Sequence, residues 1–557
     1  MAARSWGGSD MPRRQYSNTI AGLVITVVAA LAPSRAGTTP PLFAPSARCL
    51  ACHNGITTSS GEDVSIGFAW RASIMANAAR DPYWQAAVRR EIADHPDAAP
   101  IIEDECSTCH MPMARFEARA AGRKGEIFSH LGGGPQKGGA DPLAIDGVSC
   151  SLCHQLENGG PALEHDGEFR IDTARPWGER LLLGPYDIPP ARGRVMHSAT
   201  GFSPVRATNM EASELCSTCH TLYTTALAGG TKEIGRFPEQ VPYLEWRASA
   251  YAREKSCQDC HMTFTAEPTP AASVLGEPRA RFARHGFQGA NFFMLAMLER
   301  FRAELDVAAL PQELSLSRQR TLELLQTSAA TVSIARAEIR GRGLEAEVVV
   351  TNTAGHKLPT AYPSRRAWLW FVVKDVSGRA LFSSGDLRAD GSIQGNDNDA
   401  DALAFEPHRR VIDSPDQVQI YEPILADARG RVTTGLLSAV RYAKDNRLLP
   451  RGFDKTTAGD DYAVYGDARD DPDFQGGGDR VVYRPQLPAG AAGPFRVEVA
   501  LLYQPIGFRW AHNLARYASA VEPARFVHYY ESMSASSATT LASASVTVAP
   551  QTRLKDQ

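Results

Sequence analysis

The feature that most constrains this chain is a five-residue pattern, Cys-x-x-Cys-His, which occurs five times and uses all ten cysteines. Two thiols at this spacing can bond to the two vinyl groups of one porphyrin, and the histidine that follows can ligate the iron. We therefore predict five covalently attached c-type haems. The predicted attachment residues are Cys49, Cys52, Cys106, Cys109, Cys150, Cys153, Cys216, Cys219, Cys257 and Cys260, and the predicted proximal ligands are His53, His110, His154, His220 and His261.

Paired cysteines also form structural zinc sites and disulfides. Neither use requires a histidine directly after every second cysteine, and ten cysteines would make fewer than five four-coordinate zinc sites. Histidine occupies only 14 of 557 positions, so five chance coincidences are negligible. The pattern favours haem over both alternatives.

The charge of the chain bears on its partners. Its formal net charge at pH 7 is −3, which argues against nucleic acid and against a broad basic membrane face. We predict redox partner proteins and no nucleic acid, and the sequence does not indicate an oligomeric state.

The first 36 residues are typical of an export signal. Arg13 and Arg14 precede an apolar run over 19–32, and small residues at 34–36 offer a cleavage site. The run is short for a membrane span, although an uncleaved anchor is the alternative. We expect an exported protein, periplasmic or extracellular in a bacterium, with no membrane span after removal of the signal.

The fold class that we predict is multidomain, with a mainly irregular and α-helical haem region before a β-sandwich. The haem region covers 37–290, is rich in glycine and proline, and is expected to contain short helices around 69–79, 82–92 and 243–251 and little strand. Porphyrins would supply its apolar core. Residues 291–330 carry apolar side chains at helical spacing, which predicts a helical linker packed on the haem region.

After residue 330 the apolar period changes to two, as in strands. The predicted strands lie at 331–339, 344–350, 367–374, 380–383, 495–503 and 543–548. Several short strands over 331–550 favour an antiparallel, immunoglobulin-like β-sandwich. This part contains no cysteine, and therefore no covalent haem.

The sixth iron ligands must come from outside the motifs. Nine histidines remain, which is more than five irons need, so some of them are ordinary histidines. We predict His285, in glycine-rich surroundings, and His356, directly after a predicted strand of the haem-free part. His197 and His130 are further candidates, and Met75 is the candidate for the first haem. The less favoured positions are His95, His165 and Met196, while His408, His512 and His528 are expected to be structural.

The chain resembles the multihaem c-type cytochromes over roughly residues 45–385. The resemblance rests on the motifs, on the Tyr-Leu-Glu-Trp run at 243–246 and on the Gly-His-Lys-Leu-Pro-Thr run at 355–360. It is strongest with periplasmic electron carriers of the hydroxylamine-oxidation cytochrome group. The resemblance implies close-packed haems with mostly bis-His iron and suggests His285 and His356 as distal ligands. The same group contains enzymes that reduce nitrogen or sulfur oxides.

Three functional classes follow from this interpretation. We predict an electron carrier without substrate chemistry of its own, because candidate ligands outnumber the haems and no motif lacks its histidine. The alternative is a multihaem oxidoreductase of the nitrogen- or sulfur-oxide reductase type, with one open haem iron. The β-part could instead serve as an adaptor that docks a partner.

Oxygen-rich loops at 396–401 and 467–479 raise calcium as a possible second cofactor. Their spacing matches no twelve-residue calcium loop, so a solvated loop is the competing interpretation.

Overall fold

The computed structural model describes residues 41–131, 140–157 and 165–549. The predicted export signal over 1–36 lies outside these residues. Residues 41–557 form one compact unit, and the boundaries that we predicted within it, at 290 and 330, stay predictions. Within the described ranges, no helix has both the length and the apolar character needed to cross a bilayer.

Each Cys-x-x-Cys-His motif is built around one helical turn. The backbone N–H of the motif histidine donates to the carbonyl of the first cysteine, at 3.1 Å for His53 and 3.0 Å for both His154 and His220. Residues i, i+3 and i+4 share one face of a helix, so both thiols and the imidazole point the same way. The five helices are α1 (Ala47–Leu50), α4 (Ala99–His110), α7 (Cys150–Cys153), α9 (Glu214–Ser217) and α11 (Cys257–His261).

Longer helices surround these turns in the first half of the chain. The predicted helix over 82–92 is confirmed as α3 (Pro82–Asp94), which begins where Asp81 accepts the N–H groups of Tyr83 and Trp84. The helix expected over 69–79 is shorter, because α2 ends at Arg71 and turns follow it. The other helices here are α2 (Ile66–Arg71), α5 (Pro112–Ala120), α6 (Pro142–Ile145), α8 (Pro190–Thr200) and α10 (Pro242–Arg247).

The first half contains more strand than we predicted. A hairpin forms between β3 (Leu222–Leu227) and β4 (Glu233–Gln240). Two smaller pairs are also present, one parallel and one antiparallel. They are β1 (Arg180–Gly184) with β2 (Phe202–Arg206), and β5 (Thr269–Pro270) with β6 (Pro278–Arg279).

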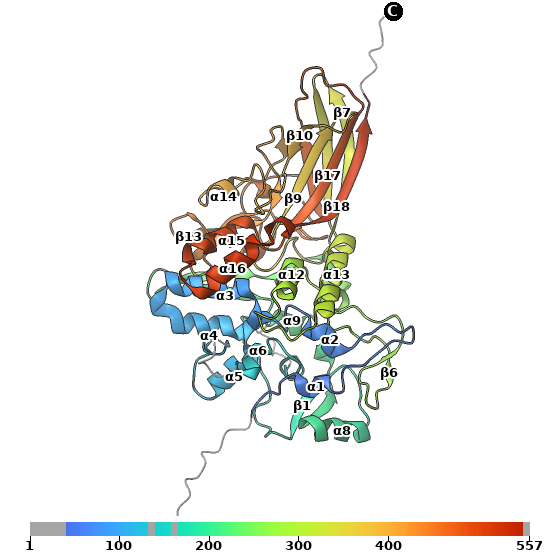
Figure 1. The fold of residues 1–557 in the computed structure, drawn as a ribbon, viewed down its shortest axis with the longest axis vertical. Helices are drawn as coiled ribbons and strands as arrows, with labels where there is room; N and C mark the ends of the chain where they lie inside the picture. Colours follow the sequence, from blue (N-terminus) through green and yellow to red (C-terminus); the bar gives the residue numbers. More distant parts are fainter. Residues whose placement is uncertain (1–40, 132–139, 158–164, 550–557) are drawn as a thin grey trace, which may run out of the picture. The chain divides into compact units, whose positions relative to one another are not determined.

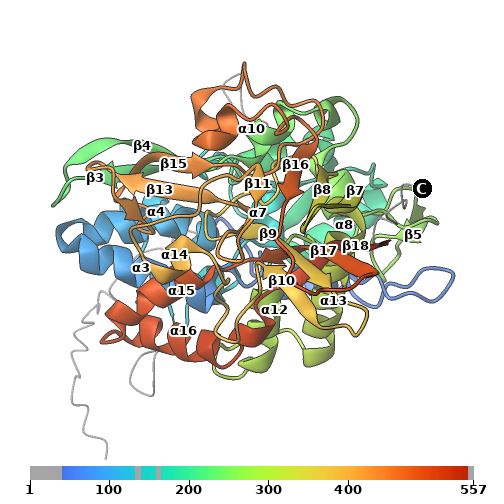
Figure 2. The ribbon, with the colours of Figure 1, turned by 90° about the horizontal axis from the view of Figure 1, so that it is seen from above.

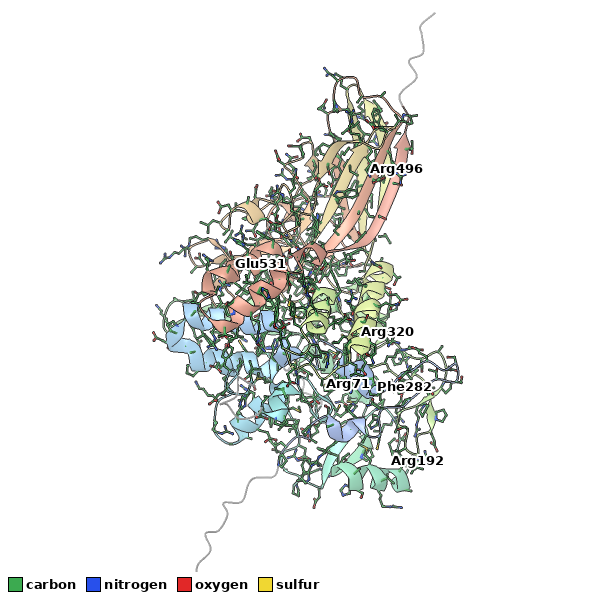
Figure 3. All side chains as sticks on the ribbon, in the orientation of Figure 1. Arg71, Arg192, Phe282, Arg320, Arg496 and Glu531 are labelled. Carbon is green, nitrogen blue, oxygen red and sulfur yellow. The ribbon has the colours of Figure 1, made fainter. Side chains whose placement is uncertain are left out.

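The predicted helices over 291–330 are confirmed as α12 (Phe292–Arg300) and α13 (Pro311–Ser328), which pack on each other. Ion pairs tie α13 to the first half, with Arg71 Nη2 at 2.5 Å from Glu313 Oε1 and Arg320 Nη2 at 3.2 Å from Glu62 Oε1. Figure 3 labels both arginines. The other end of α13 contacts the sheets of the second half, so this helix joins the two halves.

Two sheets dominate the second half. One has the strand order β10-β9-β17-β18 (Figure 1) with β12 beside β9, and the other has the order β11-β16-β8-β7, with its strands labelled in Figure 2. All six strands that we predicted here are present, and β11 runs parallel to β16 whereas the other pairs are antiparallel. The strands are β7 (Ala330–Arg340), β8 (Gly343–Asn352), β9 (Arg366–Lys374), β10 (Ala380–Ser384), β11 (Val411–Ile412), β12 (Ile420–Tyr421), β16 (Gly478–Tyr483), β17 (Phe495–Gln504) and β18 (Thr539–Val548).

The two sheets share one apolar core. The alternating side chains Ala346, Val348 and Val350 of β8 are fully buried. The rings of Phe371 in β9 and Tyr483 in β16 stack at 3.9 Å between centroids and 8° between planes. The immunoglobulin-like connectivity stays a prediction.

Further elements complete the second half, and several of them contact the first half. In Figure 2 a third sheet, with strand order β14-β13-β15, lies alongside β3 and β4, and Tyr442 Oη donates to Pro238 O at 2.6 Å. Helix α16 packs on α3, with Arg89 Nε 2.9 Å from Glu522 Oε2. These elements are β13 (Pro423–Asp427), β14 (Val432–Thr433), β15 (Ala439–Asp445), α14 (Asp397–Ala400), α15 (Phe508–Asn513) and α16 (Val521–Glu531).

We expect Phe371→Ala to destabilise the second half by about 3–5 kcal/mol, because the substitution leaves a cavity opposite Tyr483 in the buried core. Denaturant unfolding followed by far-UV circular dichroism measures this loss. Val376→Ala is the control, since Val376 is 73% exposed and its truncation should change stability by less than about 0.5 kcal/mol. Equal effects of the two substitutions would contradict the assignment of the core.

Candidate functional site

A cavity of about 1370 Å³ extends through the first half of the chain and reaches the second. This volume exceeds the roughly 300–1,000 Å³ of an ordinary small-molecule pocket. All ten cysteines and all five motif histidines line it. Among the predicted sixth ligands, His285, His356 and Met75 also line it.

Two of the predicted distal histidines face a motif histidine. The rings of His154 and His285 lie 6.5 Å apart between centroids with planes 16° apart, and those of His261 and His356 lie 6.2 Å and 12° apart. Two metal–imidazole bonds of about 2.0–2.1 Å each separate the bonded nitrogens by about 4 Å. The ring radii account for the rest of the centroid distance. Both pairs therefore have the spacing of two imidazoles on one iron.

Backbone carbonyls orient most of these imidazoles. The Nδ1 atom lies at hydrogen-bond distance from a carbonyl oxygen in six of the histidines. Such a contact holds the proton on Nδ1 and leaves the Nε2 lone pair for a metal. The pairs are His53 with Ala271 (2.7 Å), His110 with Ala78 (2.8 Å), His154 with Leu183 (2.6 Å), His261 with Gln288 (2.6 Å), His285 with Ala283 (2.9 Å) and His356 with Lys357 (2.9 Å).

Burial keeps several of these imidazoles neutral. It lowers the pKa of His110, of His220 and of His285 to about 4, and it also lowers the pKa values of His154 and His356. At neutral pH these rings therefore carry no charge. A neutral imidazole is the form that ligates a metal.

Three motif histidines have no imidazole opposite them among the described residues. His53 is within electrostatic reach of His285, which faces His154, and Met75 lines the cavity as a candidate partner for the first motif. The ring of His110 stacks flat on Trp84, at 4.1 Å between centroids and 1° between planes. His220 carries no comparable ring contact in the described chain.

Of the other candidates, Met196 also lines the cavity, whereas His130 and His197 lie outside its lining. His130 is partly exposed and pairs with Asp141, with Nδ1 3.3 Å from Oδ2, and this hydrogen bond raises the pKa of His130. His197 lies on α8, with Nδ1 3.3 Å from Ser203 Oγ. The structure brings neither histidine to a motif histidine, and their ligand role stays a prediction.

The thiols show which motifs are neighbours. Three pairs of thiol side chains lie close enough to shift each other's pKa: Cys49 with Cys150, Cys109 with Cys219, and Cys216 with Cys257. Cys216 also lies within electrostatic reach of Cys153. In space, the first motif is therefore next to the third, and the third is next to the fourth. The second and the fifth motifs are also neighbours of the fourth.

Two polar side chains of the cavity were absent from the sequence analysis. Arg365 lines the cavity within electrostatic reach of His220 and His356, and its only side-chain hydrogen bond among the described residues goes to Thr360 O at 2.9 Å. Tyr503 is fully buried, and its hydroxyl has no partner in the described chain. Nothing in the sequence around either residue distinguishes it from an ordinary strand-end arginine or core tyrosine.

The cysteines do not form a zinc site in the described ranges. There, the side chains of His, Cys, Asp and Glu converge as three ligands within 4.8 Å only at His408, Asp471 and Asp479. Amide groups of Gln419 (2.8 Å) and Asn446 (3.0 Å) donate to His408 Nδ1. The proton therefore lies on Nε2, which donates to Asp471 Oδ2 at 3.2 Å, so hydrogen bonds already satisfy this cluster.

The acidic loops that suggested calcium have other partners. Asp399 forms a bidentate pair with Arg366, at 2.8 and 2.9 Å, and Asp471 is 3.2 Å from Arg410 Nε. Calcium binding stays a prediction.

No family model matches the sequence, and no curated protein matches it. The fold is similar to that of a crystal structure of a penta-haem cytochrome c552 from Thermochromatium tepidum, with a TM-score of 0.47 and 15% sequence identity. The similarity covers 91% of this chain and all of that one. A similarity this distant carries no functional argument, so the conclusions below rest on the residues of this chain.

We expect His356→Ala to change one of five haems, because the variant removes the only described imidazole that faces His261. Magnetic circular dichroism of the oxidised protein should show one low-spin haem becoming high-spin. His512→Ala is the control, since His512 stacks on Phe508 outside the cavity lining. Five low-spin haems in His356→Ala would contradict the assignment.

We expect Glu239 to make the reduction potential of the haem predicted at Cys106 and Cys109 depend on pH. Burial raises the pKa of Glu239 to about 7, and this side chain lines the cavity within electrostatic reach of Cys106 and Cys109. Glu239 is therefore neutral at pH 6 and anionic at pH 8. The anion stabilises the more positive oxidised iron, so the potential should fall as pH rises, by tens of millivolts, which corresponds to an interaction of about 1–2 kcal/mol.

Redox titration of the wild type and Glu239→Gln at pH 6 and pH 8 measures this effect. The variant should lose the fall, whereas Glu254→Gln, a change at an exposed ion pair with Arg451, should keep it. An unchanged pH dependence in Glu239→Gln would exclude Glu239 as its source.

Proposed function

We propose that this chain is an exported pentahaem c-type cytochrome that transfers electrons through closely packed, mostly bis-His haems. The observation that carries the proposal is the pair of opposed imidazoles, His154 with His285 and His261 with His356, within a cavity lined by every motif cysteine. An ordinary protein core would fill such spaces with side chains.

The residues of the chain fit the haem group that the motifs predict. Thiols at i and i+3 on one helical turn supply the attachment points, and the imidazole at i+4 supplies the proximal ligand. When bound, c-type haem supplies reversible one-electron chemistry at its iron. The carbonyl partners of Nδ1 fix each ring orientation, and burial holds the rings neutral.

The arrangement of the motifs supports electron transfer between the predicted haems rather than five isolated redox centres. At three places a thiol of one motif lies close enough to a thiol of another motif to shift its pKa, and the two thiols are attachment points of different predicted haems. The fourth motif adjoins the second, the third and the fifth. We therefore propose a branched series of five centres with the fourth as its junction, which takes electrons from one redox partner protein and passes them to another.

The location follows from the same proposal. The basic residues and the apolar run within 1–36 support export, and c-type attachment takes place outside the bacterial cytoplasm. A periplasmic or extracellular protein without nucleic-acid partners is consistent with the net charge of −3.

Expression with a c-type maturation system tests the proposal. We expect a Soret band, five haems per chain by pyridine haemochrome assay, and a mass that exceeds the mature polypeptide by five haem groups. Cys216→Ser with Cys219→Ser should remove one haem and slow electron transfer between the others, because these residues form the junction. A purified protein with the mass of the bare chain would exclude the proposal.

One observation favours a second candidate, an oxidoreductase of the nitrogen- or sulfur-oxide reductase type with an open iron at the fourth motif. His220 has no opposing imidazole in the described chain, and both Arg365 and the unpartnered hydroxyl of Tyr503 line the cavity. A guanidinium and a hydroxyl can together bind an oxyanion. Their presence would suit a substrate such as nitrite or sulfite.

The number of high-spin haems separates the two candidates. One high-spin iron together with turnover of nitrite or sulfite, with the turnover lost in Arg365→Leu, would establish the oxidoreductase. Five low-spin irons without turnover would establish the carrier.

A further inference from the structure

Four charged side chains beside the loop that carries His356 are almost completely removed from solvent. Lys357, Asp445 and Glu245 are 0% exposed as whole residues, and Arg447 is 3% exposed. Such side chains are almost never fully buried unless they are paired. The four groups comprise two cations and two anions, and we call them the Lys357 cluster.

The pairing within the Lys357 cluster is continuous. Lys357 Nζ is 2.7 Å from Asp445 Oδ2, and Arg447 holds the same carboxylate bidentately, with Nε 2.8 Å from Oδ1 and Nη2 2.7 Å from Oδ2. The other side of the guanidinium reaches Glu245, with Nη1 2.9 Å from Oε1. Lys357 Nζ also donates to Ala463 O at 3.0 Å.

The cluster joins three separate stretches of chain. Glu245 belongs to α10 in the first half, and Asp445 ends β15 in the second. Lys357 belongs to the loop after β8, which is held further by reciprocal N–H to carbonyl bonds of 2.9 Å between Leu358 and Leu448. The cluster is therefore placed where both halves meet the loop of His356.

The backbone of Lys357 connects the cluster to the imidazole of His356. Its N–H donates to Glu245 Oε2 at 3.2 Å, and its carbonyl lies 2.9 Å from His356 Nδ1. The same Glu245 oxygen also accepts the hydroxyl of Thr360. One carboxylate of α10 thus fixes the loop on both sides of Leu358 and Pro359 and sets the carbonyl that orients the ring of His356.

We propose that Glu245 and the Lys357 cluster are positioning residues, which hold the Nε2 atom of His356 toward His261, where it would ligate the iron of a haem attached at the fifth motif. The inference rests on the proposed function, because it requires a haem attached at Cys257 and Cys260. Removing charges from solvent is costly, and apolar residues of similar volume often replace a buried ion pair without loss of stability. Stability alone therefore does not explain the cluster, whereas the specific placement of one ligand does.

The test compares Glu245→Ala with Glu245→Gln in the complete haem-loaded protein. Glu245→Ala removes the acceptor for the Lys357 N–H and the Thr360 hydroxyl, so we expect one of five haems to change from low-spin to high-spin by magnetic circular dichroism, as in His356→Ala. Glu245→Gln keeps an acceptor oxygen, so we expect it to retain five low-spin haems. Both variants should keep five covalent haems, since no attachment residue changes.

Lys444→Met is the matched control. Lys444 is also buried on β15, at 1% exposure, and pairs with Glu422 at 3.2 Å, but none of its hydrogen bonds reaches the His356 loop. We expect five low-spin haems in this variant. A high-spin haem in Lys444→Met would show that any buried charge of this region has the same effect, and would overturn the inference.

Thr360→Val decides the question if Glu245→Ala does not fold. This nearly isosteric change removes one hydrogen bond to Glu245, and we expect a partial high-spin signal that exogenous imidazole reverses. Unchanged haem spin states in a folded Glu245→Ala, or in Thr360→Val where Glu245→Ala does not fold, would overturn the inference alone. A wild-type protein without five haems would instead overturn the proposed function.

Discussion

The first half of this chain does not fill its own interior. Its apolar side chains form several small clusters, such as the one around Ile102 and Met111 and the one around Phe43 and Leu152, while the largest core lies mainly with α12, α13 and the sheets of the second half. Between the small clusters lies the cavity of about 1370 Å³. Protein interiors are normally close-packed, so a space of this size requires an occupant of matching size and apolar character. Everything else in the first half is consistent with that requirement, from the single-turn helices that present the thiols to the carbonyls that orient the imidazoles.

The second half has a structural role in this scheme. It packs α16 on α3, places its third sheet beside β3 and β4, and supplies the loop that carries His356. Its core needs no cofactor, because the buried residues of β8, β9 and β17 pack against one another. A self-sufficient β core that contributes one buried imidazole provides a fixed reference for the glycine-rich first half.

The parts of the fold that could be predicted from the sequence are those that depend on local patterns. The alternation in β8 and the apolar spacing in α12 and α13 are local, and each predicted element was found. The hairpin β3–β4 was missed, because Pro238 within β4 weakens the strand pattern. The spatial order of the motifs was not predictable, since it depends on contacts such as Cys109 with Cys219, far apart in the chain.

In the candidate site, too, some features could be predicted from local sequence and others could not. The glycine-rich context of His285 and the strand before His356 both directed attention to residues that face a motif histidine. The backbone carbonyls that bind the Nδ1 atoms could not be predicted, because every residue has a carbonyl and only the fold decides which one lies beside a histidine. Lys357 follows His356 directly, but its burial depends on Asp445, which lies 88 positions away.

The thiol neighbours have a consequence for how the protein is made. If the chain completed its fold with free thiols, Cys49 would lie against Cys150 and Cys216 against Cys257, and each pair joins two different motifs. An oxidising compartment converts adjacent thiols into disulfides, which would block both attachment points. If the proposed haems attach at these motifs, each porphyrin must be captured while the motifs are still apart, so covalent attachment would precede the last stage of folding.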